Sequence, residues 1–376
     1  MIGLSSLSLQ RLPAPVSQPR PQNRSHGSKR STTARRAVFS GAAALVVATV
    51  GFAVALDTAL PTVRYPEHGY RVAALQKLRA QHPDRPLAVV IGSSRTQMGL
   101  DPAAMGFEGE PGAPIVFNYG LIGALPVHHP LGYRRLRAAG VRPDIVVVEI
   151  FPALLHIRDA SETLYAANGA SLTGAELLRL SPDTHDPRIA RTWAESRCLA
   201  WHWFGPEVQQ QASADWLPEE VNLKHNLTWV PDRFGFRPSV TNQITDEGRQ
   251  RATEKATRLY QPVCHSLRVH PMAERAYREL VTACRADGIP VAFFLSPEAP
   301  LFHSWYTPEA RAGVAAFVRT LTDELGAPVF DVSDGWDEMD FADGHHLLPP
   351  GAAKFSRRFA AQHLRPWFRS VPPGRP

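Results

Sequence analysis

The chain has 376 residues, of which 44% are hydrophobic and 20% are charged, enough for one large α/β domain or two smaller ones. Its formal net charge of +6 is unevenly placed, because residues 1–56 hold seven Lys or Arg and no acid, which leaves 34 basic and 35 acidic residues beyond them. The body of the protein is therefore close to neutral, which excludes the basic footprint of a nucleic-acid-binding protein.

The N-terminal region divides into a polar tail and an apolar run. Residues 1–36 are rich in Ser, Pro, Gln and Arg and predict a disordered basic tail on the cytoplasmic side of a membrane. Residues 37–55 are 19 consecutive uncharged residues, just long enough to cross a bilayer as a helix. We expect a single-pass anchor over 37–56 with the body extracytoplasmic. Because Ala53-Val-Ala55 matches a signal-cleavage pattern, secretion after cleavage is the alternative.

The rest of the chain alternates between helical and strand-like segments. We expect a linker over 57–85 that contains a helix at 70–81. Near-continuous apolar runs predict buried strands at 87–91, 115–120, 144–150, 290–296 and 328–333, with helices at 130–139, 271–286 and 308–325. This alternation predicts an α/β fold with a doubly wound, mainly parallel five-stranded sheet in a flavodoxin-like three-layer sandwich.

The alternation stops in the middle of the chain, which predicts a long insertion. We expect a catalytic domain built from 86–156 and 266–370, and a cap or lid over 157–265. The insertion is rich in tryptophan: it holds Trp193, Trp201, Trp203, Trp216 and Trp229. Such rings suit stacking on sugars, although they could equally form a small core of the insertion itself.

The candidate catalytic residues lie in two stretches that are far apart in the sequence. The strand at 87–91 runs into Gly92-Ser93-Ser94, which places a hydroxyl at the carboxyl edge of the sheet beside a helix start. A turn serine that merely caps the helix is the plainer reading. After the last strand, Asp343 and His346 stand three residues apart, a spacing that lets a carboxylate orient an imidazole, which can then take a proton from a hydroxyl. This spacing favours His346 over its neighbour His345 as the base.

These two stretches together resemble the SGNH (GDSL-like) hydrolase superfamily. In that resemblance Ser94 takes the place of the nucleophile, Ser93 stands where the family more often has Asp, and Asp343 and His346 match the terminal D-x-x-H block. The block that supplies an oxyanion-hole glycine corresponds to Asn118-Tyr-Gly120. The family's Gly-x-Asn-Asp block is missing, because Glu149-Ile-Phe-Pro152 occupies its place.

The resemblance implies a mechanism and a setting. Ser94 would attack an acyl carbonyl with His346 as the base and Asp343 orienting it, while the Ser94 N–H, the Gly120 N–H and the Asn118 amide would stabilise the oxyanion. The Gly-Ser-Ser variant and the anchor are similar to a membrane-anchored branch that includes the alginate O-acetylation proteins and the teichoic-acid D-alanylation protein. That branch implies a cell-envelope polysaccharide as substrate and a membrane-bound O-acyltransferase as partner.

The sequence therefore predicts an extracytoplasmic acyl-ester enzyme, either an O-acyltransferase or an esterase. The alternative is a catalytically inactive envelope protein that binds glycan or a membrane partner. Arg95 and Glu298 are candidate substrate contacts at the same sheet edge. Cys198, Cys264 and Cys284 form no CxxC pair, and no metal-ligand spacing such as H-x-x-x-H occurs, so we expect no metal and no cofactor.

Overall fold

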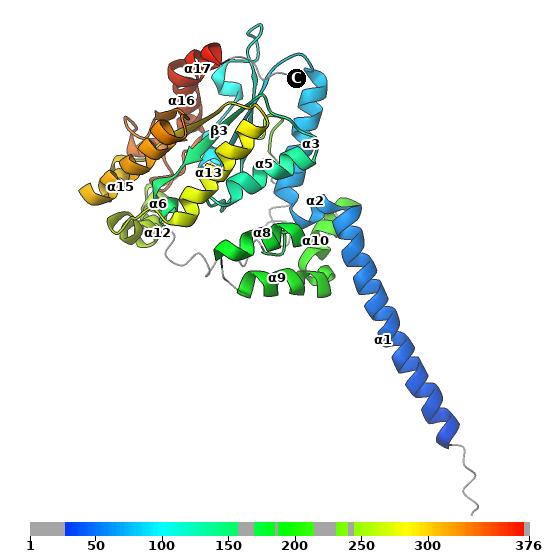
Figure 1. The fold of residues 1–376 in the computed structure, drawn as a ribbon. Coiled ribbons are helices and arrows are strands. Elements are labelled where there is room, and N and C mark those ends of the chain that lie inside the picture. The colour runs from blue at the N-terminus through cyan, green and yellow to red at the C-terminus, as the bar shows by residue number, and fades with distance from the viewer. Residues whose placement is uncertain (1–26, 157–168, 185–186, 214–230, 240–243, 372–376) are drawn as a thin grey trace, which may run out of the picture. The chain divides into compact units, whose positions relative to one another are not determined.

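The computed structural model describes residues 27–156, 169–184, 187–213, 231–239 and 244–371. The chain divides into two compact units, Met1–Ala48 and Thr49–Pro376, and the long helix α1 (Gly27–Thr58) begins in the first and ends in the second. Its stretch Thr32–Thr58 is long and apolar enough to cross a membrane, a property that an N-terminal signal sequence shares. Figure 1 follows the chain from this helix to the C-terminus.

A five-stranded, all-parallel sheet organises the second unit, in the strand order β2-β1-β3-β4-β5. The strands are β1 (Leu87–Gly92), β2 (Ile115–Gly120), β3 (Ile145–Ile150), β4 (Val291–Leu295) and β5 (Val329–Asp331). All five lie within the predicted runs or differ from them by a residue or two. The predicted α/β fold with a doubly wound parallel sheet is confirmed.

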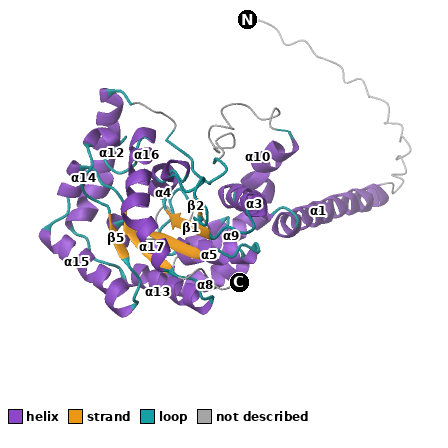
Figure 2. Cartoon of the chain, turned by 90° about the horizontal axis from the view of Figure 1, so that it is seen from above, coloured by secondary structure: helices purple, strands orange, loops and turns teal. Residues whose placement is uncertain are grey.

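Helices cover both faces of the sheet, as Figure 2 shows with the orange strands between two groups of helices. Among the residues of the second unit that the structure describes, the helices are α2 (Pro61–Arg64), α3 (Pro66–Gln81), α4 (Ser94–Gly99), η1 (Ala103–Met105), α5 (His128–Ala138), α6 (Pro152–Leu155), α8 (Gly174–Thr184), α9 (Pro187–Cys198), α10 (Ala200–Ala212), α12 (Asp246–His265), α13 (Pro271–Ala286), α14 (Pro300–Ser304), α15 (Pro308–Arg319), η3 (Thr320–Glu324), η4 (Glu338–Asp340), α16 (Pro349–Phe359), η5 (Ala360–Leu364) and α17 (Arg365–Ser370).

Successive side chains of a strand point to opposite faces of the sheet, and each face has its own hydrophobic core. In β1, Val89 and Ile91 face a core shared with α3, α5, α13 and α15. Ala88 and Val90 face the opposite core, which α12, α14 and α16 complete. β1, β2, β3 and β4 are buried on both faces, which is why they read as near-continuous apolar runs rather than as an alternating pattern. β5, predicted as a buried strand, is only partly buried because it lies at the edge of the sheet.

Parts of the predicted cap belong to the main body. In the segment 231–239, Phe234 packs in one core and Phe236 in the other, and the Phe234 carbonyl accepts the Asn118 N–H at 2.8 Å along the outer edge of β2. Helix α12 contributes Ala256 and Cys264 to the second core. Trp216 and Trp229, two of the tryptophans expected in the cap, lie outside the described residues.

The three cysteines form no disulfide with one another. All three are free thiols; Cys264 and Cys284 are buried in the two cores, whereas Cys198 is exposed at the end of α9. Burial raises the pKa of both buried thiols to about 12, so at neutral pH they act as small apolar groups.

Two buried histidines at the start of α5 should make stability depend on pH. Burial lowers the pKa of His128 to about 3 and that of His129 to about 4, from an ordinary value of 6.5. The unfolded chain therefore binds protons that the folded chain does not, and the free energy of unfolding should fall as pH drops from 6.5 towards 4, by up to about 1.4 kcal/mol per pH unit for each histidine.

A single substitution isolates one of these contributions. The ring nitrogens of His129 have no hydrogen-bond partner among the described residues, and the ring packs 5.5 Å from that of Tyr277, so His129→Phe should keep the packing and remove the titration. We expect chemical denaturation between pH 4 and 7.5 to show a shallower slope for this variant. Substitution of the exposed His265 by Gln is the control. An unchanged slope in His129→Phe would contradict the assignment.

Candidate active site

The carboxyl end of β1 lies where the strand order of the sheet reverses. β1 pairs with β2 on one side and with β3 on the other, and the later strands extend outward from β3. In open parallel sheets, ligands bind in the crevice at such a reversal, outside the carboxyl ends of the strands. Ser94 begins α4 directly after β1 and therefore lies where this fold is expected to carry a site.

The two adjacent serines make different contacts. Ser93 has an extended backbone and its hydroxyl accepts the Arg95 N–H at 3.2 Å, so it caps α4. Ser94 is the first residue of the helix, and its N–H is one of the groups that a helix leaves without an intrahelical acceptor. The capping role considered for this turn therefore falls to Ser93 and leaves the Ser94 hydroxyl for another contact.

A tight turn after β5 holds the second half of the site. Phe341 pairs with Leu347 as an antiparallel bridge that closes the turn. Gly344 inside it has φ +88°, a left-handed conformation that glycine adopts without steric cost. The Asp343 Oδ1 accepts the backbone N–H of His346 at 2.8 Å, so the turn itself fixes the carboxylate beside the imidazole.

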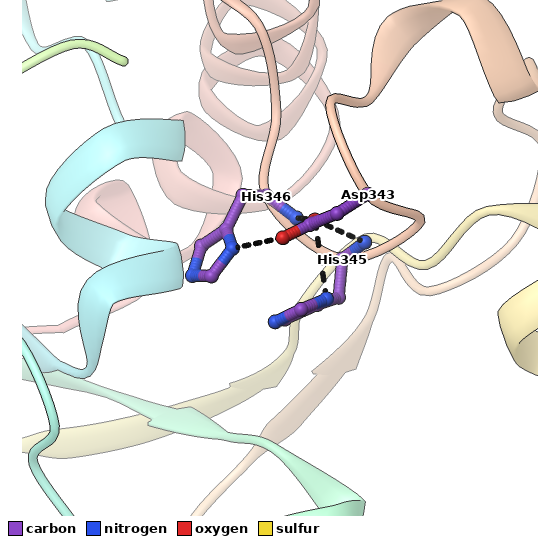
Figure 3. A group of neighbouring side chains, drawn as sticks. All are labelled: Asp343, His345 and His346. Atoms are coloured by element: carbon purple, nitrogen blue, oxygen red, sulfur yellow. Dashed lines mark hydrogen bonds and ion pairs between the residues drawn. The ribbon is translucent and has the colours of Figure 1, made fainter. Parts of the chain in front are cut away.

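Hydrogen bonds join Asp343, His346 and Ser94 into a relay. The Asp343 Oδ2 lies 2.8 Å from His346 Nδ1, and His346 Nε2 lies 2.8 Å from Ser94 Oγ. Figure 3 marks the contact between Asp343 and His346 with a dashed line. If Nδ1 carries the proton that Asp343 accepts, Nε2 of the neutral ring is free to accept the Ser94 hydroxyl proton. This is the arrangement that activates a serine as a nucleophile.

The electrostatics of the turn keep the carboxylate ionised. Burial alone would raise the pKa of the Asp343 carboxyl, but the charges and hydrogen bonds of His346 and His345 outweigh it and hold that pKa well below its usual value. Asp343 can therefore stabilise an imidazolium without itself taking a proton.

His345, the neighbour that could be mistaken for the base, has a different environment. Its ring is buried, stacks on Phe151 with centroids 5.9 Å apart, and lies 4.8 Å from the ring of Tyr260. Burial, together with the charge of His346, lowers the pKa of His345 to about 4, so it is neutral at physiological pH. Its Nδ1 lies 3.1 Å from Asp343 Oδ1.

The same three side chains are close enough together to raise the question of a metal ion. Asp343, His345 and His346 each offer a ligand atom within 4.8 Å of the others. However, Nδ1 of His346 faces Asp343 Oδ2 at 2.8 Å, and a nitrogen that donates a proton there has no lone pair for a metal. Because the other nitrogen of His346 faces Ser94, the arrangement favours serine activation.

A buried carboxylate beneath the nucleophile turn is a feature that sequence reasoning missed. Glu149 of β3 is 1% exposed, and its Oε2 accepts the Ser93 N–H at 2.6 Å and the Thr96 hydroxyl at 2.9 Å. Its Oε1 accepts the Ser296 hydroxyl at 2.9 Å, beyond the end of β4. The available signal was a lone Glu inside an otherwise apolar strand, since a buried charge needs such partners.

This carboxylate also explains the glycine that precedes the two serines. A Cβ at Gly92 would lie 2.6 Å from Glu149 Oε2 and would collide with the Thr96 side chain. Glycine is therefore required for the strand end to approach the carboxylate so closely. Glu149 joins the ends of β1, β3 and β4 and fixes the backbone from which Ser94 projects.

Arg95 and Glu298, expected as candidate substrate contacts, are both buried. Their side chains are 2% and 1% exposed, and they form an ion pair with 3.3 Å between Arg95 Nη1 and Glu298 Oε1. The Arg95 guanidinium also stacks 3.9 Å from the Phe151 ring centroid and lies 3.9 Å from Glu149 Oε1. Burial raises the pKa of the Glu298 carboxyl. The Arg95 side chain points into the protein and pairs with Glu298, so the two residues stabilise the site from the interior.

Two of the predicted oxyanion donors, the Gly120 N–H and the Asn118 amide, form hydrogen bonds inside the fold. The Gly120 N–H donates to the Asn118 side-chain oxygen at 2.8 Å. The Asn118 amide nitrogen donates to the carbonyls of Thr96 and Leu100 at 2.7 and 2.6 Å, and the residue is fully buried. Asn118 therefore ties β2 to α4. Of the three donors expected for an oxyanion hole, two are therefore used inside the fold, which leaves the Ser94 N–H.

Gly120 has a packing role as well. A Cβ at this position would lie 2.8 Å from both the Ser93 carbonyl oxygen and the Gln97 Cα. The absence of a side chain therefore lets β2 pass against the first turn of α4.

Comparison with protein-family models gave no match for this chain, and neither did comparison with curated proteins. The case for its function therefore depends on the geometry described above.

Removal of the buried carboxylate should disturb both folding and the nucleophile. Glu149→Gln keeps the shape but places an amide nitrogen against groups that already donate, so we expect a loss of about 2–4 kcal/mol in the free energy of unfolding. Denaturation monitored by circular dichroism measures this loss. The matched control is Glu298→Gln, which removes a buried charge without touching the Ser93 N–H. Wild-type stability in Glu149→Gln would contradict its assigned role.

Proposed function

We propose that this protein is a serine-dependent acyl-ester enzyme, either an O-acyltransferase or a carboxylic-ester hydrolase. The observation that carries the proposal is the relay from Asp343 through His346 to Ser94, with 2.8 Å at each of its two side-chain links. The position of Ser94 at the reversal of strand order is a second support.

The residues have defined roles in this proposal. His346 Nε2 takes the Ser94 hydroxyl proton as Oγ attacks the acyl carbonyl carbon, and Asp343 stabilises the imidazolium that results. The Ser94 N–H donates to the oxyanion, and one such donor contributes about 3 kcal/mol in known enzymes. His346 then returns the proton to the departing alcohol, which leaves an acyl group on Ser94. Attack by water on that group makes the protein an esterase, and attack by a sugar hydroxyl makes it a transferase.

The resemblance to the SGNH superfamily supports this assignment at the level of order along the fold. The nucleophile block follows the first strand, and the Asp343–His346 block follows the last strand of a parallel sheet. The chain departs from that pattern at β3, where Glu149 occupies the place of the Gly-x-Asn-Asp block. In this protein that position supports the nucleophile turn rather than an oxyanion.

We infer that α1 is an uncleaved anchor and that the catalytic unit lies outside the cytoplasm. The basic residues that precede the apolar run support this orientation. The residues around the cleavage-like Ala53-Val-Ala55 are helical, and Ala53 and Leu56 are buried against α10. The Arg64 guanidinium donates to the Ala53 carbonyl at 3.1 Å, so cleavage here would remove part of a packed cluster.

An anchored acyl-ester enzyme on this side of a membrane would meet cell-envelope polysaccharides. We propose these polymers as its substrates and a membrane-bound O-acyltransferase as its partner, on the strength of the resemblance to the alginate O-acetylation and teichoic-acid D-alanylation proteins. Analysis of envelope-glycan acyl esters after deletion of the gene tests the substrate assignment, and co-purification of a membrane-bound O-acyltransferase with the full chain tests the partner.

One observation favours a second function, that of an inactive envelope protein that binds glycan or a membrane partner. Asn118 and Gly120 use their donors inside the fold, which leaves the proposed oxyanion site with the Ser94 N–H alone among the expected donors. A protein that retained the relay as a structural remnant would bind a ligand without forming an acyl group on Ser94.

Labelling with a fluorophosphonate probe separates the two functions. We expect the full chain to form an adduct on Ser94, identified by peptide mass spectrometry, and Ser94→Ala to form none. Asp343→Asn should slow labelling by roughly 10²–10⁴-fold, because His346 then loses the carboxylate that fixes its tautomer.

The matched control is the adjacent hydroxyl. Ser93→Ala removes the cap of α4 and should lower the free energy of unfolding by about 1 kcal/mol while labelling persists. Addition of EDTA should leave labelling unchanged, whereas a metal-dependent site at Asp343 and His345 would lose it. Absence of any adduct on Ser94 in a folded wild-type protein would favour the binding protein.

A further inference from the structure

The end of α1 packs firmly against the helices that follow it along the chain. Ala53 and Leu56 are buried in a small cluster with Phe204 of α10. The Arg64 guanidinium stacks 5.0 Å from the Phe204 ring centroid and pairs with Asp57. Within the unit Thr49–Pro376, α10 therefore has a fixed position beside the last turns of α1, as Figure 1 also shows.

Two large apolar side chains at the start of α10 are exposed beside α1. Leu199 and Trp201 each have more than half of their surface exposed. We name these two residues the junction patch. Val50 and Val54, in the last turns of α1, are exposed as well, but each stands two residues from Phe52 and so lies on the side of the helix turned away from α10.

The contact between Trp201 and α1 fixes the depth of this patch. The Trp201 ring lies 5.7 Å from the ring of Phe52, centroid to centroid. Phe52 stands five residues before Asp57, the first charged residue after the apolar run. At 1.5 Å per residue this is about 7 Å back along the helix, so Trp201 lies beside the last turns of the run and not beyond its end.

We propose that the junction patch lies in the interfacial layer of a lipid bilayer, so that α10 is a membrane-docking element and Trp201 its anchor. This inference rests on the proposed role of α1 as a membrane span. A bilayer is the occupant because the Trp201 ring lies against Phe52, which belongs to the apolar run itself, so the patch stands at the depth of that run. Tryptophan prefers this layer, since its ring is apolar while its N–H needs a polar partner.

The consequence is a fixed height of the catalytic unit above the membrane. A flexible tether would let that unit explore a range of distances, whereas a packed helix junction with a second contact in the interface allows few. A site held in this way suits an acyl donor or acceptor that is itself bound to the membrane surface.

Spin labels on the full chain in lipid nanodiscs test the proposal. In a Cys198→Ser background, where the remaining Cys264 and Cys284 are buried, a nitroxide is attached at Trp201→Cys, Val46→Cys or Met339→Cys. Met339 is an exposed control in η4, and Val46 lies within the apolar run. Collisions with oxygen, which enters lipid, are compared with those of water-soluble nickel ethylenediaminediacetate.

We expect the ratio of oxygen to nickel collisions at position 201 to be several-fold above that at position 339 and below that at position 46, as an interfacial depth requires. A lipid-like ratio at 46 together with a water-like ratio at 201 would overturn the docking proposal alone. A water-like ratio at 46 would overturn the membrane span and the docking proposal together.

A second measurement covers the case in which the Trp201→Cys variant does not fold. Brominated lipids quench the fluorescence of tryptophans that reach the bilayer. The quenched fraction of the fluorescence should therefore be larger in the wild type than in Trp201→Phe, a variant that keeps an aromatic ring beside Phe52. Equal quenching of wild type and Trp201→Phe would contradict the docking of Trp201.

Discussion

The buried carboxylate of Glu149 is the constraint on which the site depends. It stands in the central part of the sheet and accepts hydrogen bonds from the Ser93 N–H, the Thr96 hydroxyl and the Ser296 hydroxyl. A charge buried this deeply is tolerated only when its hydrogen-bonding capacity is met, so the three strand ends that it joins are fixed relative to one another. This arrangement also constrains the sequence, because a side chain at position 92 would collide with Glu149 and Thr96, so only glycine fits there.

The catalytic geometry follows from combining that fixed strand end with a rigid turn. Glu149 and the Ser93 cap set the start of α4, and the Phe341–Leu347 bridge sets the turn that carries His346. The two halves meet across 252 residues of sequence at a distance of 2.8 Å between Ser94 Oγ and His346 Nε2. Neither half needs to move to form the relay, so the serine is positioned before any substrate arrives.

Much of the fold could be predicted from the sequence because parallel strands buried on both faces read as apolar runs. The Asp343–His346 spacing likewise located one half of the relay. The roles of Asn118 and Arg95 could not be predicted, since their partners come from other segments: the Asn118 amide bonds to carbonyls of α4, and Arg95 turns inward to Glu298. A polar residue beside a strand end can face the substrate or the interior, and only the tertiary contacts decide between them.

In the proposed reaction, Ser94 forms a covalent acyl-enzyme intermediate with His346 as the base. Rapid quenching of the full chain after mixing with p-nitrophenyl acetate, followed by peptide mass spectrometry, tests it most directly. We expect Ser94 to be acetylated in the wild type, and its acetylation to be absent or strongly delayed in His346→Ala. Ester cleavage with the acetyl group on another residue, or an equal yield on Ser94 in the two proteins, would contradict it.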